Sequence, residues 1–392
     1  MARRRKKADR RTTLRVTLAG WLFLLISLLV GLAAVRSQMP LMFVLFGAML
    51  GGMAVSSMIA RGMVIAAGVH RELPTRAWQF EAVYFGYFLR NRRRRAPCLG
   101  LALHEIAPKG VENAYGYCVH LPGRGAFRAG CRLSAENRGR VDLQGVRLAT
   151  KFPFGLVMVK RDVEQPASLV VWPAKGRIKS NLFRRGALEA SSAPPSRLQG
   201  GQDEFFGLRE YRPGDSPRWI HWRRSAGRET PVVREMAHPV PDVLFLVLDT
   251  RLDKKEVLSE WQRERMLRFA ATLIDQALMR GFQVGMAMAG ADGPRVFSPA
   301  MGVGARTGLL DALADVSGEE QTPFRRVVEA IPVSAVHNAQ TFLLTEDRES
   351  ISPAVLVNLG RSARHLEVIG PTDLDGIFED HPLVQPRETP CP

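Results

Sequence analysis

Two long apolar stretches near the N-terminus constrain this chain more than any other feature. Val16 to Val35 contains no charged residue, and neither does Ser37 to Ala60, with Arg36 alone between them. At about 1.5 Å rise per residue, each stretch can cross a hydrocarbon core of about 30 Å as a helix. Pro40 marks a turn between them. The sequence therefore predicts a transmembrane helical hairpin over residues 16–60, in which Gly47, Gly51 and Gly52 let the two helices approach closely.

The charges that flank the hairpin predict its orientation. Eight basic residues lie between Arg3 and Arg15, and an arginine cluster at residues 90–95 follows the second stretch. The positive-inside rule then places both termini in the cytoplasm, with residues 1–15 as a basic cytoplasmic tail. A cleaved signal peptide is the alternative for the first stretch, since a basic head and Ala33-Ala34 fit that pattern loosely. The length of the run and the second stretch favour the hairpin.

The basic composition is confined to the same region. Residues 1–100 hold 17 Lys and Arg against three acidic residues, so only +3 of the net charge of +17 belongs to the rest of the chain. The remainder is nearly neutral, which argues against a nucleic-acid-binding surface there. The four cysteines, Cys98, Cys118, Cys131 and Cys391, have no CxxC spacing, so the sequence suggests neither a zinc site nor a thioredoxin motif.

Short alternating segments separated by Gly, Pro and Asn predict a small β-sandwich of immunoglobulin-like or fibronectin-like type over residues 75–173. The expected strands are Val83–Leu89, Leu99–Leu103, Gly116–Leu121, Val146–Thr150 and Leu169–Trp172. Residues 174–201 are rich in Gly, Ser and Pro and are expected to form a linker loop.

A dense signature follows the linker, from Gly207 to Asp249. Arg212-Pro-Gly-Asp215 has Pro and Gly at the positions that suit a type II turn. Asp215 or Ser216 is then expected to cap a short helix that starts at Pro217. Trp219 and Trp222, three residues apart, would share one face of that helix and anchor the corner on a sheet.

The signature resembles that of domain-of-unknown-function family 58. The resemblance rests on Gly207-Leu-Arg-Glu-Tyr-Arg-Pro-Gly-Asp215, on Arg218-Trp-Ile-His-Trp222, on Ser225-Ala226 and on a strand that ends at Asp249. It implies a bacterial, membrane-anchored protein with a von Willebrand factor A-like domain, hence a place in the bacterial inner membrane. It also implies a MoxR-type AAA ATPase as the partner.

The segment after the signature alternates strands and helices, which predicts an α/β doubly wound sheet. The von Willebrand A-like domain, together with the signature, is expected over residues 202–380, followed by a C-terminal tail over 381–392. The expected elements are strands at 243–248, 284–289, 341–344 and 366–369, and helices at 257–279, 308–316 and 354–363. Ligands of such sheets bind beyond the C-terminal strand ends. These ends are Asp249, Gly290–Gly293 and Thr345–Asp347.

The resemblance also implies a Mg²⁺ site built on an Asp-x-Ser-x-Ser motif, and this chain departs from that motif. The corresponding run is Asp249-Thr-Arg-Leu-Asp253, so Arg251 stands where the first Ser is expected. A hard cation needs oxygen ligands, and a guanidinium only donates. Asp249, Asp253 and Asp347 are therefore degenerate candidates, and we expect no Mg²⁺ and no other cofactor.

Three classes of function remain at this point. The first is a non-enzymatic adaptor that works with the ATPase in protein assembly or maturation. Its partner-binding residues would be Arg209, Tyr211, Arg212, Gly214, Asp215, Arg218, His221 and Trp222. The second is a hydrolase in which Asp215 and His221 act as acid and base, although no activated nucleophile accompanies them. The third is a nucleic-acid binder that uses the tryptophans and arginines, although acidic residues alternate with them.

Overall fold

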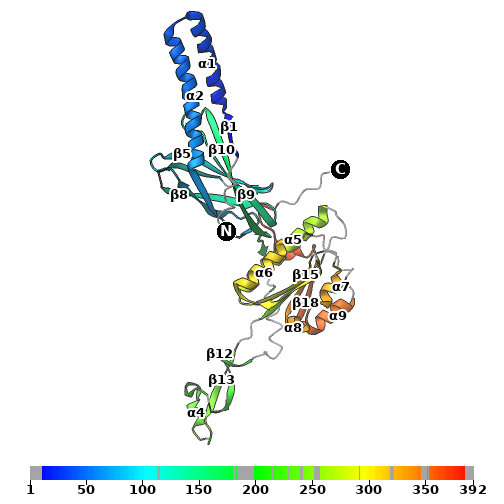
Figure 1. Ribbon diagram of the computed structural model, residues 1–392. Coiled ribbons are helices and arrows are strands. Elements are labelled where there is room, and N and C mark those ends of the chain that lie inside the picture. The colour runs from blue at the N-terminus through cyan, green and yellow to red at the C-terminus, as the bar shows by residue number, and fades with distance from the viewer. Residues whose placement is uncertain are drawn as a thin grey trace. The chain divides into compact units, whose positions relative to one another are not determined.

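In the computed structural model the chain forms two compact units, residues 1–174 and 175–392 (Figure 1). The described residues are 11–112, 115–179, 182, 198–213, 215–227, 229–238, 242–250, 257–290, 292–317, 322–345, 351 and 353–384.

The first unit contains the predicted apolar helices, α1 (Leu18–Ser37) and α2 (Pro40–Ala66), which form an antiparallel hairpin (Figure 1). Both are long and apolar enough to cross a membrane. Helix α2 runs past the predicted end at Ala60, and its last turns are buried: Met63 is 6% exposed and Val64 is fully buried. The second apolar helix therefore continues directly into the hydrophobic core of the first unit.

The contact between the two helices differs from the expected one. A Cβ added to Gly31 would lie 2.9 Å from the ring of Phe46, so α1 approaches α2 closely at this glycine. A Cβ on Gly47, Gly51 or Gly52 would meet no atom within 4 Å. The prediction that these three glycines bring the helices together was wrong, because the space next to each of them is open and no part of α1 approaches it.

Two sheets enclose the core of the first unit. The larger has the strand order β1-β10-β9-β5-β7, with β3 paired to β10, and the smaller has the order β2-β4-β8-β6. The strands are β1 (Arg11–Val16), β2 (Ala67–Glu72), β3 (Arg76–Trp78), β4 (Val83–Asn91), β5 (Cys98–Ile106), β6 (Val111–Glu112), β7 (Tyr115–Leu121), β8 (Ala126–Ala135), β9 (Gly139–Thr150) and β10 (Val157–Trp172). Their inner faces share one cluster of buried residues, to which the end of α2 also contributes. Cys98, Cys118 and Cys131 are buried free thiols.

Strand β1 corrects the assignment of the N-terminal region. Arg11 to Arg15 were expected to belong to a tail and Val16 to the first span, yet this segment pairs antiparallel with β10, from Arg11 opposite Asp162 to Val16 opposite Val157. Edge strands commonly carry charged side chains, which discourage pairing with other chains, and a segment of this kind resembles a tail in sequence. Because β1 precedes the helical hairpin and β2 follows it, the first unit holds both ends of the hairpin.

The second unit contains a five-stranded mixed sheet in the order β16-β15-β14-β17-β18. The strands are β14 (Val243–Leu248), β15 (Gln283–Ala289), β16 (Pro294–Ala300), β17 (Gln340–Leu344) and β18 (His365–Ile369). Four of them are parallel, as predicted, and β16 is an antiparallel edge strand that the sequence did not indicate. The expected ligand-edge loop Gly290–Gly293 is therefore the turn of a hairpin, closed by the amide of Gly290 on the carbonyl of Gly293.

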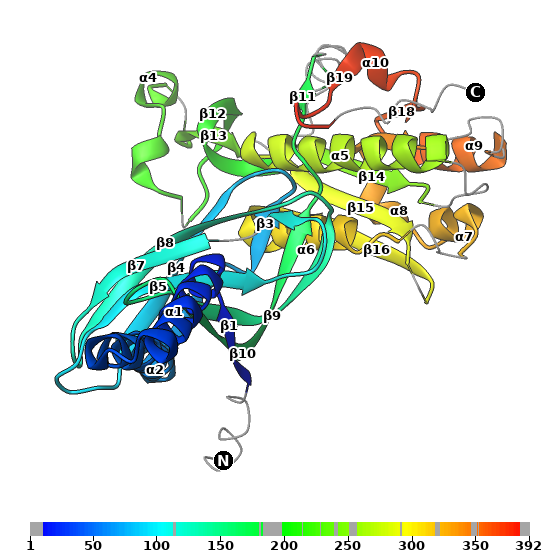
Figure 2. The ribbon, with the colours of Figure 1, turned by 90° about the horizontal axis from the view of Figure 1, so that it is seen from above.

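Helices cover both faces of this sheet (Figure 2). Helix α5 (Val257–Met279) packs beside α6 (Gly302–Ala314) on one face. Helices α7 (Phe324–Glu329), α8 (Val333–Val336) and α9 (Pro353–Ser362) share a buried cluster with the opposite face, which includes Phe245. A further helix, α10 (Leu374–Ile377), precedes β19 (Phe378–Glu379).

Part of the expected linker is regular structure. Arg177–Ile178 forms β11, which pairs antiparallel with β19. The backbone amide of Gly176 also donates to Thr272 Oγ1 on α5 at 3.0 Å. These residues carry too few apolar side chains to indicate a strand, and only their pairing with the C-terminal region reveals one. Most of residues 180–197 lie outside the described part of the chain.

Candidate functional site

The signature forms its own two-stranded sheet, from β12 (Leu198–Glu210) and β13 (Val232–His238). The two strands and the segment 211–231 between them are called the signature hairpin. The segment contains a 3₁₀ turn at Pro217–Trp219 and one turn of α-helix, α4, at Trp222–Ser225. Trp219 and Trp222 thus lie in two separate turns rather than on one helical face. The expected single helix was wrong, because Ile220 has extended backbone and pairs with Val233.

A chain of hydrogen bonds closes the signature hairpin from within. The backbone amide of His221 donates to the carbonyl of Val232 at 2.8 Å, and Ser225 Oγ donates to the carbonyl of His221 at 3.1 Å. Ser225 Oγ in turn accepts from the amide of Val232 at 2.9 Å. The amide of Tyr211 donates to the carbonyl of Pro231 at 2.8 Å. These bonds hold the segment against the start of β13, so the corner has a defined shape.

Asp215 is the centre of the turn that precedes the 3₁₀ helix. Its carboxylate accepts two hydrogen bonds of 2.6 Å from the guanidinium of Arg209, and one of 2.8 Å from the backbone amide of Arg212. The amide of Asp215 closes the turn on the carbonyl of Arg212 at 3.0 Å. A turn is therefore present at the predicted place, and its predicted type II geometry depends on Gly214, which lies outside the described residues. Ser216 occupies the capping position of the 3₁₀ turn and makes no side-chain cap bond there.

The pair of Arg209 and Asp215 changes the interpretation of Arg209. A bidentate arginine–carboxylate pair fixes the relative position of its two side chains. The Arg209 side chain is 29% exposed and that of Asp215 is 18% exposed. Arg209 was expected to be a partner-binding residue, and this geometry gives it a role in holding the turn.

The acid sensitivity of the turn follows from the same contacts. The hydrogen bonds from Arg209 and from the Arg212 amide hold the pKa of Asp215 at about 2, below its ordinary value of 3.8. A carboxyl group with a lowered folded-state pKa stabilises the fold above its unfolded pKa and loses that contribution as it protonates. We expect the amide of Arg212 to lose protection from hydrogen exchange as the pH falls from about 4 to about 2. Asp215→Asn should show low protection at both pH values, and equal protection in both proteins would contradict this prediction.

Trp222 is the clearest difference from the sequence-based expectation. Its side chain is 67% exposed, so it cannot anchor the hairpin as a buried residue does. The arginines on the same segment, Arg212, Arg218, Arg223 and Arg224, are exposed as well. These five residues are called the signature tip. Large aromatic residues and arginine are the residue types that most often dominate binding at protein interfaces.

His221 and Asp215 have separate structural roles. His221 caps α4, where its Nδ1 accepts from the amide of Arg224 at 3.4 Å. Asp215 is engaged by Arg209 and Arg212, and none of the hydrogen bonds that the structure gives these two side chains joins one to the other. The arrangement that a general acid–base pair requires is thus not formed by the described contacts.

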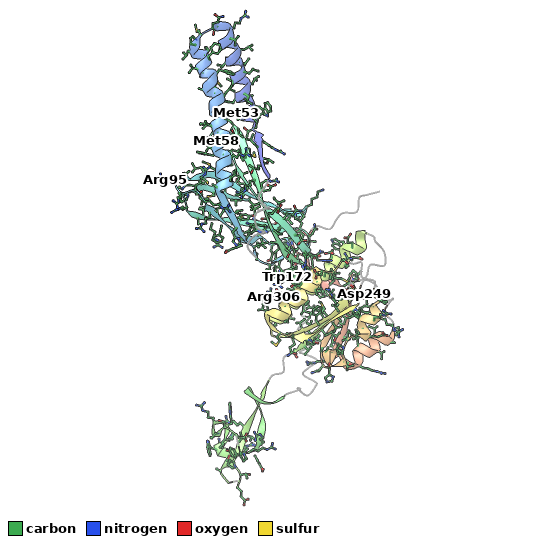
Figure 3. All side chains as sticks on the ribbon, in the orientation of Figure 1. Met53, Met58, Arg95, Trp172, Asp249 and Arg306 are labelled. Carbon is green, nitrogen blue, oxygen red and sulfur yellow. The ribbon has the colours of Figure 1, made fainter. Side chains whose placement is uncertain are left out.

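The edge of the five-stranded sheet holds the degenerate metal candidates. Asp249 follows β14 and is half-buried (Figure 3), whereas Asp253 and Asp347 lie outside the described residues. The adjacent Thr250 is 1% exposed, and its Oγ1 has no hydrogen-bond partner among the described residues. Within the same residues there is no group of three His, Cys, Asp or Glu side chains that could hold a metal ion. The expectation that the protein uses no Mg²⁺ stays a prediction.

Comparisons with known proteins identify one family. Residues 207–369 match the family described as "Protein of unknown function DUF58". No curated protein matches the chain.

Two solved structures show only weak similarity. The DNA-bound alkylpurine DNA glycosylase AlkC of Pseudomonas fluorescens is 14% identical, with 28% of this chain and 32% of that chain covered and a TM-score of 0.18. The sporulation control protein Spo0M of Bacillus subtilis is 13% identical, with 37% of this chain and 58% of that chain covered and a TM-score of 0.15. TM-scores this low establish no shared fold.

Proposed function

We propose that this chain, a DUF58 protein by its match over residues 207–369, is a membrane-anchored, non-enzymatic adaptor that presents the signature tip to a protein partner. The observation that carries the proposal is the exposure of Trp222, 67%, among four exposed arginines. An indole left in water on a corner held by internal hydrogen bonds has no evident role in stability. A preformed corner also loses little conformational entropy on binding.

The chemistry of the tip indicates the kind of partner. Between Gly207 and Pro231 there are six arginines and three acidic residues, and one of those acidic residues, Asp215, is neutralised by Arg209. The complementary surface would be acidic, with an apolar pocket for the indole. The family resemblance points to a MoxR-type AAA ATPase as that partner, and to assembly or maturation of other proteins as the shared task.

The second unit fits the proposed von Willebrand A-like domain. Its parallel strands follow the spatial order β15-β14-β17-β18, with helices on both faces, which is an arrangement of doubly wound sheets. In such sheets the ligand crevice lies where the strand order reverses, here between β14 and β17. Asp249 and Thr345, which follow these two strands, would lie at this crevice.

The helical hairpin would anchor the adaptor in the bacterial inner membrane, with both termini in the cytoplasm. Two features support this arrangement: α1 and α2 are long and apolar enough to span a membrane, and the first unit holds both ends of the hairpin. An integral protein resists extraction by alkaline carbonate. Release of the full chain from membranes under those conditions would contradict the anchoring.

The adaptor proposal predicts that tip variants fold normally and fail to capture the partner. Trp222→Ala and Arg218→Ala change exposed side chains, so each should alter the free energy of unfolding by about 1 kcal/mol or less. Matched controls are Tyr84→Ala, an aromatic residue 75% exposed on β4, and Arg326→Ala, an exposed arginine on α7. The measurement is co-purification of the ATPase with the full chain from solubilised membranes, beside thermal unfolding of each variant.

Three outcomes of this experiment would count against the adaptor. If the tip variants capture the ATPase as well as the two controls do, the tip is not the contact surface. If Trp222→Ala unfolds the protein, the tip is a structural corner. If the wild-type chain recovers nucleic acid and no ATPase, the exposed indole and arginines serve as a stacking and phosphate-binding surface instead.

A further inference from the structure

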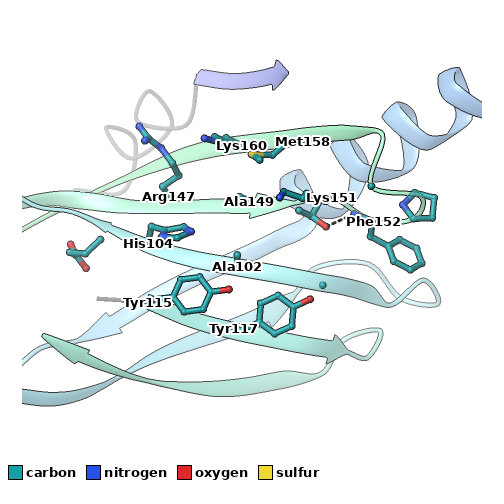
Figure 4. A pocket seen from close by; sticks show the side chains of 15 residues that line it. Ala102, His104, Tyr115, Tyr117, Arg147, Ala149, Lys151, Phe152, Met158 and Lys160 are labelled. Atoms are coloured by element: carbon teal, nitrogen blue, oxygen red, sulfur yellow. Dashed lines mark hydrogen bonds between the residues drawn. The ribbon is translucent and has the colours of Figure 1, made fainter. Parts of the chain in front are cut away.

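The outer face of the larger sheet of the first unit contains a groove of about 740 Å³ (Figure 4). Side chains alternate along a strand, so Leu101 and Leu103 of β5 enter the core while Ala102 and His104 face outward. The groove follows these outward positions across β7, β5, β9 and β10. It lies on the side of the sheet opposite the hydrophobic core and belongs entirely to the first unit.

The strand register explains why this face is concave. Tyr117, Ala102, Ala149 and Lys160 are neighbours in one row across the four strands. The two alanines occupy the central strands and form a low floor, while the tyrosine and the lysine rise from the flanking strands. In the next row His104 packs against Tyr115, with 4.9 Å between the ring centroids.

The positive charge of the groove lining comes from two lysines. Arg147 is neutralised by Asp162 of β10, to which it donates hydrogen bonds of 2.6 and 2.9 Å. In contrast, Lys151 and Lys160 have no ion pair among the described residues. Burial, together with the positive charges of Lys160 and Arg147, lowers the pKa of His104. Two uncompensated ammonium groups therefore face the groove beside two tyrosine side chains.

One end of the groove contacts the start of the first apolar helix. Gly155, which lines the groove, accepts a hydrogen bond of 2.6 Å from Thr17 Oγ1. The backbone amide of Thr17 donates to the carbonyl of Leu156 at 3.0 Å. Thr17 is the N-cap residue of α1, so this end of the groove lies where the hairpin leaves the sheet. If α1 spans the membrane, the groove is next to the headgroup layer.

We propose that this groove binds the phosphate-bearing headgroup of an anionic phospholipid. Lys151 and Lys160 would hold the phosphate, and the hydroxyls of Tyr115 and Tyr117 would bond to the polar remainder of the headgroup. A lysine close to an anionic membrane surface contributes a favourable interaction that a neutral headgroup cannot match. The proposal rests on the membrane anchoring proposed above, and it is independent of the signature tip.

The test is native mass spectrometry of the full chain in neutral detergent, with short-chain phosphatidylglycerol as the probe and short-chain phosphatidylcholine as the neutral comparison. We expect one phosphatidylglycerol to be retained, and Lys151→Ala/Lys160→Ala to bind it roughly 30-fold more weakly. The matched control is Lys109→Ala/Arg132→Ala, which removes two exposed cations elsewhere on the first unit. It should bind as the wild type does.

Equal binding of the two lipids, or undiminished binding by the Lys151/Lys160 variant, would overturn the proposal. Glycerol 3-phosphate, which has the phosphate but no acyl chains, distinguishes a lipid headgroup from a soluble phosphate ester as the ligand. If it binds as tightly as phosphatidylglycerol, the ligand is a soluble phosphate ester and the assignment to a lipid is wrong. The Trp222→Ala variant should retain the lipid, so failure of this proposal and failure of the adaptor would be seen in different variants.

Discussion

Glu105→Ala is expected to destabilise the first unit by about 3–5 kcal/mol, because it leaves a guanidinium buried without its counter-charge. Glu105 pairs with Arg71, and the two side chains are 0% and 3% exposed. Its second oxygen accepts a hydrogen bond from the hydroxyl of Tyr87, which is also fully buried. Arg71 donates further to the carbonyl of Gln165 on β10. The network therefore joins both sheets. Removal of any one of its side chains leaves another buried without its hydrogen-bond or charge partner.

The electrostatics of the network explain why the carboxylate needs its partners. Burial raises the pKa of Glu105, while the hydrogen bond from Tyr87 and the charge of Arg71 act to lower it. Burial and the nearby carboxylate raise the pKa of Tyr87, so its hydroxyl remains a donor. A carboxylate that is costly to bury is thus held in place by two donors.

An exposed pair on the same unit provides the matched control. Arg147 and Asp162 form a comparable arginine–carboxylate pair, with side chains 42% and 35% exposed. Asp162→Ala should cost about 1 kcal/mol or less, because solvent screens the charges. The measurement is the urea dependence of amide exchange in β4 and β5 of the full chain in neutral detergent. Equal losses for Glu105→Ala and Asp162→Ala would show that burial does not decide the cost.

A double variant separates the loss of stability caused by an unpaired buried charge from the net contribution of the ion pair to stability. Glu105→Gln with Arg71→Met removes both charges while keeping similar volumes. Replacement of a buried ion pair by well-packed residues is often close to neutral. The double variant should therefore be more stable than Glu105→Ala, and a loss as large as that of the single variant would contradict this explanation.

Elements with a strong local pattern were predictable from the sequence. Helix α5 has the predicted bounds, Val257–Met279, because its apolar residues recur at helical spacing and Gly281 follows. The parallel strand β14 was evident from its unbroken apolar run. Strand β16 was missed because its side chains are mostly exposed or half-buried, so its sequence shows neither a run nor an alternation.

The candidate site was less predictable, because exposure depends on contacts far along the chain. Trp222 was expected to be buried, as large aromatic residues usually are, and nothing in its local sequence indicates that it faces solvent. For Glu105, in contrast, the local sequence does indicate that the side chain is buried. The alternation that buries Leu101 and Leu103 places Glu105 on the same inner face of β5, which demands a buried partner. The identity of that partner, Arg71, could be known only from the pairing of the sheets.

Arg161→Met is expected to loosen the junction between the apolar helix α2 and the sheets of the first unit. Arg161 lies on β10 and is 4% exposed. Its Nη1 donates to the carbonyls of Val64 at 2.8 Å, Ile65 at 3.0 Å and Ala67 at 3.2 Å. The last carbonyls of a helix have no partner within the helix and form the negative end of its dipole. The buried guanidinium of Arg161 thus satisfies the carbonyls of Val64 and Ile65 at the end of α2.

Methionine fills a similar volume and donates nothing, so these carbonyls would stay buried without a donor. An unsatisfied buried polar group costs about 1–3 kcal/mol, which gives a total of about 3 kcal/mol or more for the variant. The amides of β2, Ala67–Glu72, should lose protection from hydrogen exchange in the full chain in neutral detergent. Arg132→Met, a change at an exposed position of β8, should leave the protection of the β2 amides unchanged. Unchanged protection in Arg161→Met would mean that water replaces the guanidinium, and that α2 is held by apolar packing alone.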